Sequence, residues 1–313
     1  MCGFICVYGE DGGSVVPEVL RGLLAIQHRG QDAAGIVSYA DKFHAKKGLG
    51  LVRDVFSEKH LERLAGNLAV GHVRYPTVGL GTELDVQPFW MDFPLGIAMA
   101  HNGNVTNFLE LKRDYFPARG IHLSSECDLE AVLYVFASAL IRAGDGEVTA
   151  ERLFRAVAEV FQVVKGSYSV VGIIAGQGAF AFRDPYGIKP IILGQRVNGG
   201  SSFAVASESV VLDVNGYETQ EDLGAGEALF IDAERRMHRR RILERPHRPC
   251  IFELVYFARP DSFLDKVSVY KTRLRLGESL AEKWRRSGLE ADVIVPVPES
   301  ARKIGRASCR ERV

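Results

Sequence analysis

The sequence predicts an α+β fold built from layers of helices and antiparallel sheet. Up to about residue 232, short runs rich in Val, Ile, Phe and Ala, bounded by Gly, Asp or Pro, are interspersed with amphipathic runs. The amphipathic runs come late and in groups instead of one after each strand, which favours α+β over a doubly wound parallel sheet. The glycines form neither GxGxxG after a strand nor GxxxxGK followed by Ser or Thr, so a Rossmann or P-loop fold has little support.

These patterns also locate the individual elements. Strand-like runs of β-branched and aromatic residues lie between turn-forming residues, and helix-like runs place apolar side chains three and four positions apart. The expected strands are residues 3–8, 35–39, 68–73, 97–101, 169–174, 179–182, 190–193, 203–206 and 228–231. The expected helices are residues 16–27, 58–64, 107–115, 128–142 and 150–164.

A strongly basic segment, residues 235–248, marks a boundary in the chain. It lacks interleaved aromatic residues, so an exposed strand and linker are favoured over a nucleic-acid-binding patch. Beyond it we expect a strand, a helix and a strand, at 251–257, 272–287 and 292–297, too little for an independent α/β domain. The expected organisation is a first domain over residues 2–235, a basic linker over 236–250, an incomplete second domain over 251–300 and a tail over 301–313.

Composition excludes several classes of protein. Of 313 residues, 47% are hydrophobic and 25% charged, as in ordinary globular proteins, and the formal net charge is zero, so we expect no nucleic-acid partner. The longest apolar stretch, near residues 170–182, is too short and interrupted to span a membrane, and no signal-peptide pattern begins the chain. The 5 cysteines are odd in number and include no CxxC pair, which indicates reduced thiols in a cytoplasmic protein without a zinc site.

The N-terminus carries a candidate nucleophile, Cys2. Aminopeptidases remove an initiator Met that precedes a small residue, which would leave the Cys2 thiol beside a free α-amine. That amine has an ordinary pKa of about 7.7–8.0, so it could accept the thiol proton directly or through a water. On position alone, the alternative that Cys2 is a small apolar residue opening a strand, like Cys6, is favoured.

A second candidate follows the expected strand at 97–101. Asn102 and Gly103 could aim a side-chain amide and a backbone N–H at a developing oxyanion. The alternative is an ordinary Asn-Gly turn between two elements, and taken alone that alternative is favoured.

Three further segments could bind a substrate. A strand ends at Arg74, whose guanidinium could hold a carboxylate with Thr77 as an added donor; the alternative is a structural salt bridge. Asp128 begins an apolar run, and its spacing from Ser125 matches a capping box, although the carboxylate could also receive a substrate ammonium. Residues 27–35 combine two glycines with two alanines, which allows a ligand close to the backbone.

Together these segments resemble the glutamine amidotransferases of the N-terminal-nucleophile class (class II), and within them the amidophosphoribosyltransferase family. The resemblance covers nearly all of residues 2–300, and residues 252–262 (FELVYFARPDS) distinguish this family from sister amidotransferases that make glucosamine phosphate or asparagine. The other matching segments are 1–3 (MCG), 27–36 (QHRGQDAAGI), 71–77 (GHVRYPT), 87–89 (QPF), 100–104 (AHNGN), 182–190 (FRDPYGIKP), 206–209 (ASES) and 226–227 (GE).

The resemblance implies a four-layer αββα sandwich of the N-terminal-nucleophile hydrolase type, followed by an incomplete phosphoribosyltransferase-type α/β domain. Cys2 would attack the carboxamide of glutamine to give a thioester, with Asn102 and Gly103 as the oxyanion hole. Ammonia would then travel inside the protein to phosphoribosyl pyrophosphate and give 5-phosphoribosylamine in purine synthesis. An alternative is a catalytically silent glutamine-binding or regulatory fragment.

The resemblance also assigns the residues that would bind glutamine. Arg74, helped by Thr77, would hold the α-carboxylate, and Asp128 with Gly103 would hold the α-ammonium. The remaining residues of the implied pocket are Arg29, Gly30 and, as a gate that orders when the second substrate arrives, Tyr75.

The chain departs from the family near its end. Residues 301–313 do not resemble the family, and the sequence contains no Asp-Asp pair for the pyrophosphate-binding strand, so the phosphoribosyl pyrophosphate and Mg²⁺ sites are expected to be largely missing. Cys250 stands where some relatives have one iron–sulfur ligand, but we expect neither a cluster nor any other metal or cofactor in this chain. The family also implies a homo-oligomer at full length and no membrane partner.

Overall fold

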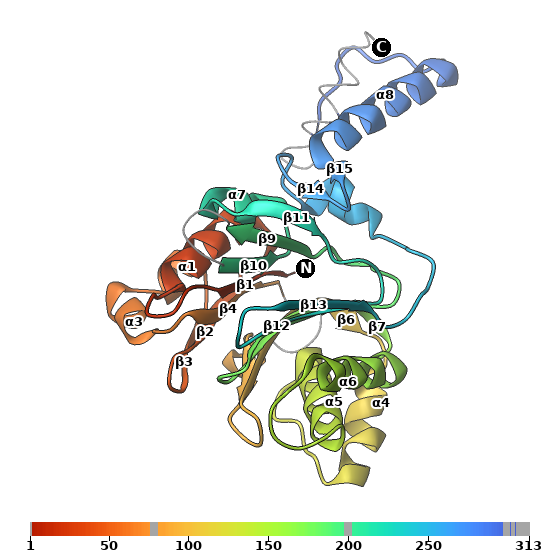
Figure 1. The fold of residues 1–313 in the computed structure, drawn as a ribbon. Coiled ribbons are helices and arrows are strands. Elements are labelled where there is room, and N and C mark those ends of the chain that lie inside the picture. Colours follow the sequence, from red (N-terminus) through yellow and green to blue (C-terminus); the bar gives the residue numbers. More distant parts are fainter. Residues whose placement is uncertain (1, 76–80, 197–201, 297–300, 302–303, 305–313) are drawn as a thin grey trace. The chain divides into compact units, whose positions relative to one another are not determined.

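The computed structural model describes residues 2–75, 81–196 and 202–296, together with Ala301 and Ile304. The chain divides into two units, Met1–Pro249 and Cys250–Val313, and each is described here by itself. Figure 1 shows the two sheets of the first unit and the long helix of the second. Within the residues described, no helix is both long enough and apolar enough to cross a membrane.

The first sheet is antiparallel throughout, with β1 at its centre. Its strand order is β11-β9-β10-β1-β4-β2-β3, and Ile5 of β1 lies opposite both Ala206 and Gly71. Every residue of β1 is buried, which explains its continuous apolar sequence, because both faces of this strand are covered. The strands are β1 (Gly3–Tyr8), β2 (Ala33–Tyr39), β3 (Phe43–Leu49), β4 (Leu68–Arg74), β9 (Ile192–Arg196), β10 (Ser202–Ala206) and β11 (Glu218–Asp222).

The second sheet is also antiparallel, in the order β13-β12-β8-β7-β6-β5. Its longest pairing joins β6 to β7, from Ile97 opposite Ile174 to Val105 opposite Gly166. The strands are β5 (Phe89–Met91), β6 (Ile97–Val105), β7 (Gly166–Ile174), β8 (Gly178–Arg183), β12 (Glu227–Asp232) and β13 (Met237–Arg241).

Three apolar clusters define the layers of the first unit. Side chains alternate along β1, so Ile5 and Val7 pack with residues of α1, whereas Phe4 and Cys6 pack with residues of the second sheet. The second sheet buries its other face against α5 and α6 (Figure 1). This order of helix, sheet, sheet and helix confirms the expected αββα sandwich. The helices are α1 (Val16–Ala25), α2 (Val52–Val55), α3 (Glu58–Arg63), α4 (Phe108–Glu110), α5 (Asp128–Arg142), α6 (Ala150–Val163) and α7 (Ser209–Asn215), with short turns η1 (Gln27–Arg29), η2 (Glu83–Asp85), η3 (Leu111–Tyr115) and η4 (Pro117–Arg119).

Every strand expected over the first 231 residues has a counterpart, but several elements were not expected. The sequence did not predict β3, β5, β11, α2 or α7, whereas β13 lies in the basic segment where an exposed strand was expected. Strand β13 lies within the expected linker, so the sheet continues past the boundary drawn at residue 235; its charged residues pair through the backbone with β12. The helix expected over 107–115 is shorter and irregular, being α4 followed by the π-helical turn η3.

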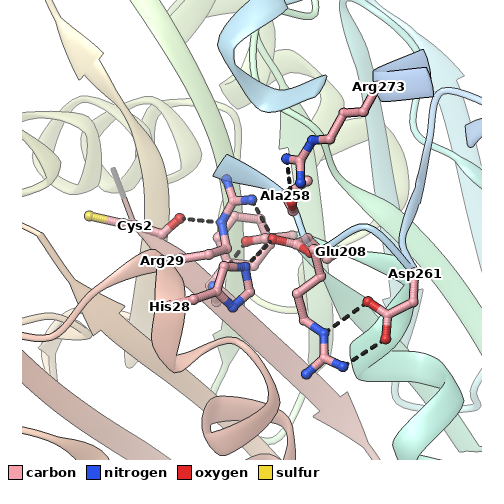
Figure 2. Close-up of polar contacts among 10 residues, drawn as sticks. Cys2, His28, Arg29, Glu208, Ala258, Asp261 and Arg273 are labelled. Carbon is pink, nitrogen blue, oxygen red and sulfur yellow. Dashed lines mark hydrogen bonds and ion pairs between the residues drawn. The ribbon is translucent and has the colours of Figure 1, made fainter. Parts of the chain in front are cut away.

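The second unit is small and differs from its prediction at both ends. Residues 251–257, expected as a strand, include the π-helical turn η5 (Glu253–Phe257), because a short apolar run fits either structure. The expected helix is confirmed as α8 (Val269–Ser287), preceded by the two-residue strands β14 (Phe263–Leu264) and β15 (Val267–Ser268). Arg273 donates a hydrogen bond of 2.8 Å to the carbonyl of Ala258 (Figure 2) and another of 2.8 Å to that of Leu254, which anchors η5 to α8. Residues 292–296 are not in a strand, and residue 297 lies outside the described residues.

Candidate active site

Cys2 lies directly before the central strand β1 and is buried, with 8% of its surface exposed. Its backbone N–H donates to Oδ1 of Asn102 at 3.4 Å, and its thiol lies 3.8 Å from the carbonyl oxygen of Tyr75. Burial raises the pKa of the Cys2 thiol, and the positive charge of the chain's N-terminus is the largest effect that opposes this. The thiol is therefore protonated at rest and needs a base before it can act as a nucleophile.

The carbonyl of Cys2 is held by a buried ion pair. Arg29 donates from Nε to the Cys2 carbonyl at 3.0 Å, and its Nη1 lies 2.6 Å from Oε1 of Glu208 (Figure 2). His28 contacts the same carboxylate oxygen at 2.9 Å. Burial alone would raise the pKa of Glu208, but Arg29 and His28 outweigh it and lower that pKa to about 2. The Arg29 guanidinium thus connects the Cys2 carbonyl to Glu208, a contact that the sequence did not indicate.

Arg74 ends β4 and is buried, and Gly30 lies against its backbone. A Cβ atom at Gly30 would come within 2.6 Å of the backbone nitrogen of Arg74, so this position must remain glycine for the two segments to approach. Nη1 of Arg74 lies 3.9 Å from Oδ2 of the buried Asp85. The next residue, Tyr75, is exposed, and Thr77 lies outside the described residues.

Asn102 and Gly103 lie within β6 and not in a turn, which corrects the Asn-Gly turn considered from the sequence. They pair with Ser169 and Tyr168 of β7, and the strand continues to Val105. A Cβ atom on Gly103 would lie 2.0 Å from the carbonyl oxygen of a β7 residue, so only glycine fits there. Nδ2 of Asn102 is buried and has no hydrogen-bond partner among the residues described, which leaves a donor available to a ligand.

Asp128 is the first residue of α5, and its carboxylate faces the end of β6. Oδ2 accepts a hydrogen bond of 2.7 Å from the Val105 N–H, and Oδ1 lies 3.3 Å from Nε2 of His101. Burial lowers the pKa of His101, which favours its neutral form. His101 was not singled out from the sequence, although it stands within a quoted motif.

The predicted capping box is wrong. Helix α5 begins at Asp128, so Cys127 and not Ser125 precedes it, and no side chain caps it. The Ser125 N–H and hydroxyl instead donate to the carboxylate of Glu130, at 2.8 and 2.6 Å. A carboxylate in the first turn of the helix therefore organises the preceding loop.

The structure brings most of the expected residues to one end of the stacked sheets. Cys2 directly precedes β1 of the first sheet and Arg74 ends β4 of the same sheet, Asn102 lies in the second sheet, and Asp128 begins a helix of the outer layer. Within the part of the chain that the structure describes, no group of three or more His, Cys, Asp or Glu side chains is placed to hold a metal ion.

Comparisons with known proteins show which family the sequence and the fold resemble. A family model described as a glutamine amidotransferase domain matches residues 72–214. The amidophosphoribosyltransferase of Pseudomonas aeruginosa is 44% identical over 96% of this chain and 61% of its own length, and that of Escherichia coli is 42% identical over the same shares. The solved structure of a glutamine phosphoribosylpyrophosphate amidotransferase from B. subtilis, complexed with ADP and GMP, superposes with a TM-score of 0.84 at 30% identity, covering 99% of this chain and 64% of that one.

The chain thus spans about three-fifths of the length of the curated relatives that it matches. The likeness in sequence extends over 96% of the chain, and the likeness in structure includes both the sandwich and the second unit. The chain belongs to the amidophosphoribosyltransferase family of glutamine amidotransferases.

Proposed function

We propose that this chain hydrolyses glutamine to glutamate and ammonia at Cys2. In the whole protein, this step would feed ammonia to phosphoribosyl pyrophosphate and give 5-phosphoribosylamine. The observation that carries the proposal is the meeting of Cys2 with Asn102, whose Oδ1 accepts from the Cys2 N–H while its buried Nδ2 has no partner among the described atoms. A nucleophile beside an unsatisfied amide donor is the arrangement that acyl transfer requires.

The proposed reaction begins once Met1 has been removed. The free α-amine of Cys2 takes the thiol proton, and the thiolate attacks the carboxamide carbon of glutamine. The negative charge that develops on the carboxamide oxygen is stabilised by Nδ2 of Asn102 and the Gly103 N–H. When the carbon–nitrogen bond breaks, the protonated amine gives its proton to the departing ammonia. Water then cleaves the thioester, with the same amine as base, and releases glutamate.

The charges around Cys2 suit an amino acid. We propose that Arg74, assisted by Thr77, binds the α-carboxylate of glutamine. Asp128 and Gly103 would bind its α-ammonium. Both oxygens of Asp128 already have a partner, but each carboxylate oxygen can accept a second hydrogen bond. Gly30 allows the backbone to approach Arg74, and Tyr75 would close over the bound substrate.

We further propose that the glutaminase step uses no metal or cofactor and takes place in the cytoplasm. The partners would be glutamine, phosphoribosyl pyrophosphate and further copies of the chain. The relatives' names support the two substrates, and the chemistry of a cysteine nucleophile, which needs no Lewis acid, supports a step without a metal or cofactor.

The test is ammonia release from glutamine by the parent protein and by Cys2→Ala. We expect the variant to lose release while keeping the fold, since Ala fits where a small side chain stood. Cys6→Ala, in the buried layer between the sheets, is the matched control and should keep the parent rate. Ammonia release by Cys2→Ala at the parent rate would refute the proposal. An intact mass that shows Met1 retained, with glutamine bound but not hydrolysed, would favour the silent binding fragment.

A further inference from the structure

We infer that Asp85 is a positioning residue, which aligns Arg74 for the α-carboxylate of glutamine and ties Arg74 to the loop that presents Asp128. This inference rests on the proposed glutaminase function. Asp85 is the last residue of the short turn η2 and is 1% exposed. It belongs to none of the motifs that identify the family.

The two oxygens of Asp85 face different parts of the site. Oδ1 accepts a hydrogen bond of 2.9 Å from the N–H of Glu126, two residues before Asp128. Oδ2 lies 3.9 Å from Nη1 of Arg74. The Asp85 side chain thus connects two elements. One is the end of β4, which would bind the α-carboxylate of the substrate, and the other is the start of α5, which would bind its α-ammonium.

The Oδ2 atom is unusual because it is buried and has no hydrogen-bond partner among the atoms that the structure describes. Leaving a buried carboxylate oxygen unpaired is costly, so a fold retains one only where its charge is useful. At 3.9 Å the pair with Arg74 is an ion pair without a hydrogen bond. The charge of Asp85 would therefore orient the Arg74 guanidinium, although Oδ2 is too far from Nη1 to accept a hydrogen bond from it.

The charge of Asp85 can be separated from its role in the loop. Asp85→Asn keeps the size of the side chain and an oxygen that can accept from the Glu126 N–H, but it removes the charge opposite Arg74. Asp85→Glu keeps the charge on a longer side chain. Glu83→Gln, at an exposed position of the same turn, is the control for removing a carboxylate nearby.

The experiment compares glutamine with two truncated forms of it, in the whole chain. γ-Aminobutyramide lacks the α-carboxylate and keeps the amine, whereas glutaramate lacks the amine and keeps the carboxylate. Each is tested as a substrate or, where turnover is too slow, as a competitive inhibitor of glutamine hydrolysis. Direct binding of glutamine and glutamate is measured in parallel by calorimetry.

We expect Asp85→Asn to raise the KM for glutamine about tenfold, as loss of one charged contact would, with little change in kcat. Binding of glutaramate should weaken by a similar factor, and binding of γ-aminobutyramide by less than about twofold, because only the contact with the carboxylate depends on Arg74. Asp85→Glu should recover most of the loss, and Glu83→Gln should match the parent. In the Arg74→Ala background, Asp85→Asn should have no further effect.

Equal losses for both truncated compounds would overturn the inference, because they would mark Asp85 as a general support of the fold. An unchanged KM in a protein that hydrolyses glutamine would also overturn it and leave the proposed function intact. If the parent binds glutamine without hydrolysing it, the proposed function fails. This inference then stands only if Asp85→Asn weakens the binding measured by calorimetry for ligands that carry the α-carboxylate and not for γ-aminobutyramide. If Asp85→Asn does not fold, Asp85→Ala replaces it as the uncharged variant, and a KM for Asp85→Glu equal to that of Asp85→Ala would overturn the inference.

Discussion

The backbone nitrogen of Cys2 lies 3.4 Å from Oδ1 of Asn102, although Cys2 precedes a strand of the first sheet, Asn102 lies in the second, and the two stand 100 positions apart in the sequence. Stacking of the sheets, and not chain proximity, therefore assembles the site. Because the amide oxygen faces Cys2, the amide nitrogen of Asn102 is left as a buried donor without a partner in the described part of the chain. One side chain would then both position the nucleophile and stabilise the charge that its attack creates.

Asn102→Ala should lower kcat for glutamine hydrolysis by about 10²–10³-fold, the usual effect of removing one oxyanion donor. The KM should change much less, since the ground-state contacts to the ends of the substrate remain. Steady-state assays of ammonia release measure both quantities. Asn104→Ala, on the same strand but exposed, is the control and should be near the parent. A large KM effect with unchanged kcat would show that Asn102 binds the ground state.

Glu208→Gln should destabilise the fold by about 3 kcal/mol, because it leaves the buried charge of Arg29 without its partner. Urea unfolding at neutral pH measures this, and the exposed Glu218→Gln should change little. Ammonia release should fall as well, since Arg29 also holds the Cys2 carbonyl. Equal unfolding midpoints for parent and Glu208→Gln would contradict the importance of this pair.

The carboxylate of Glu208 should make part of the protein's stability depend on pH in the acid range. Folding lowers the pKa of Glu208 from 4.5 to about 2. Above pH 4.5, the pKa of Glu208 in the unfolded chain, this carboxylate contributes fully to the free energy of unfolding. The contribution is lost as the pH falls toward about 2, the pKa of Glu208 in the folded protein. Below pH 4.5, the parent should lose stability more steeply than Glu208→Gln. Parallel stability curves for the two proteins would be the contrary result.

Gly30→Ala should weaken glutamine binding through steric displacement of Arg74. The added methyl group would stand 2.6 Å from the Arg74 backbone, so one of the two segments must move. We expect a raised KM for glutamine and a loss of about 1–3 kcal/mol in stability, typical of overpacking. Gly13→Ala is the control, because the nearest atom to its Cβ would be 3.8 Å away. A parent-like KM would show that Arg74 tolerates the shift.

The central elements of the fold could be predicted because their sequences are apolar on both faces. The elements that were not predicted lie largely at the edges of the sheets. Strand β3 (FHAKKGL) and strand β11 (ETQED) are polar, and pairing of their backbones with β2 and β9 makes them strands. An apolar pattern cannot reveal such strands, since little of their stability comes from buried side chains.

The motifs of the site could be found in the sequence, but not the contacts between them. The polar run that begins at Asn102 ends the apolar pattern, so the strand was expected to stop there; pairing with β7 carries it on to Val105. The partners Glu208 and Asp85 are visible only in three dimensions, because Glu208 stands 179 positions from Arg29 and Asp85 stands 41 from Glu126. No local spacing encodes contacts of that length.

The central claim is that the thiol of Cys2 is the acceptor of the glutamine acyl group. The most direct measurement is labelling with a diazoketone analogue of glutamine, mapped by peptide mass spectrometry, in protein whose intact mass shows that Met1 has been removed. The buried thiols of Cys6 and Cys127 serve as internal controls, because burial raises the pKa of each to about 12. We predict a single adduct on Cys2 that excess glutamine prevents. An adduct on another cysteine, or none on Cys2, would contradict the account.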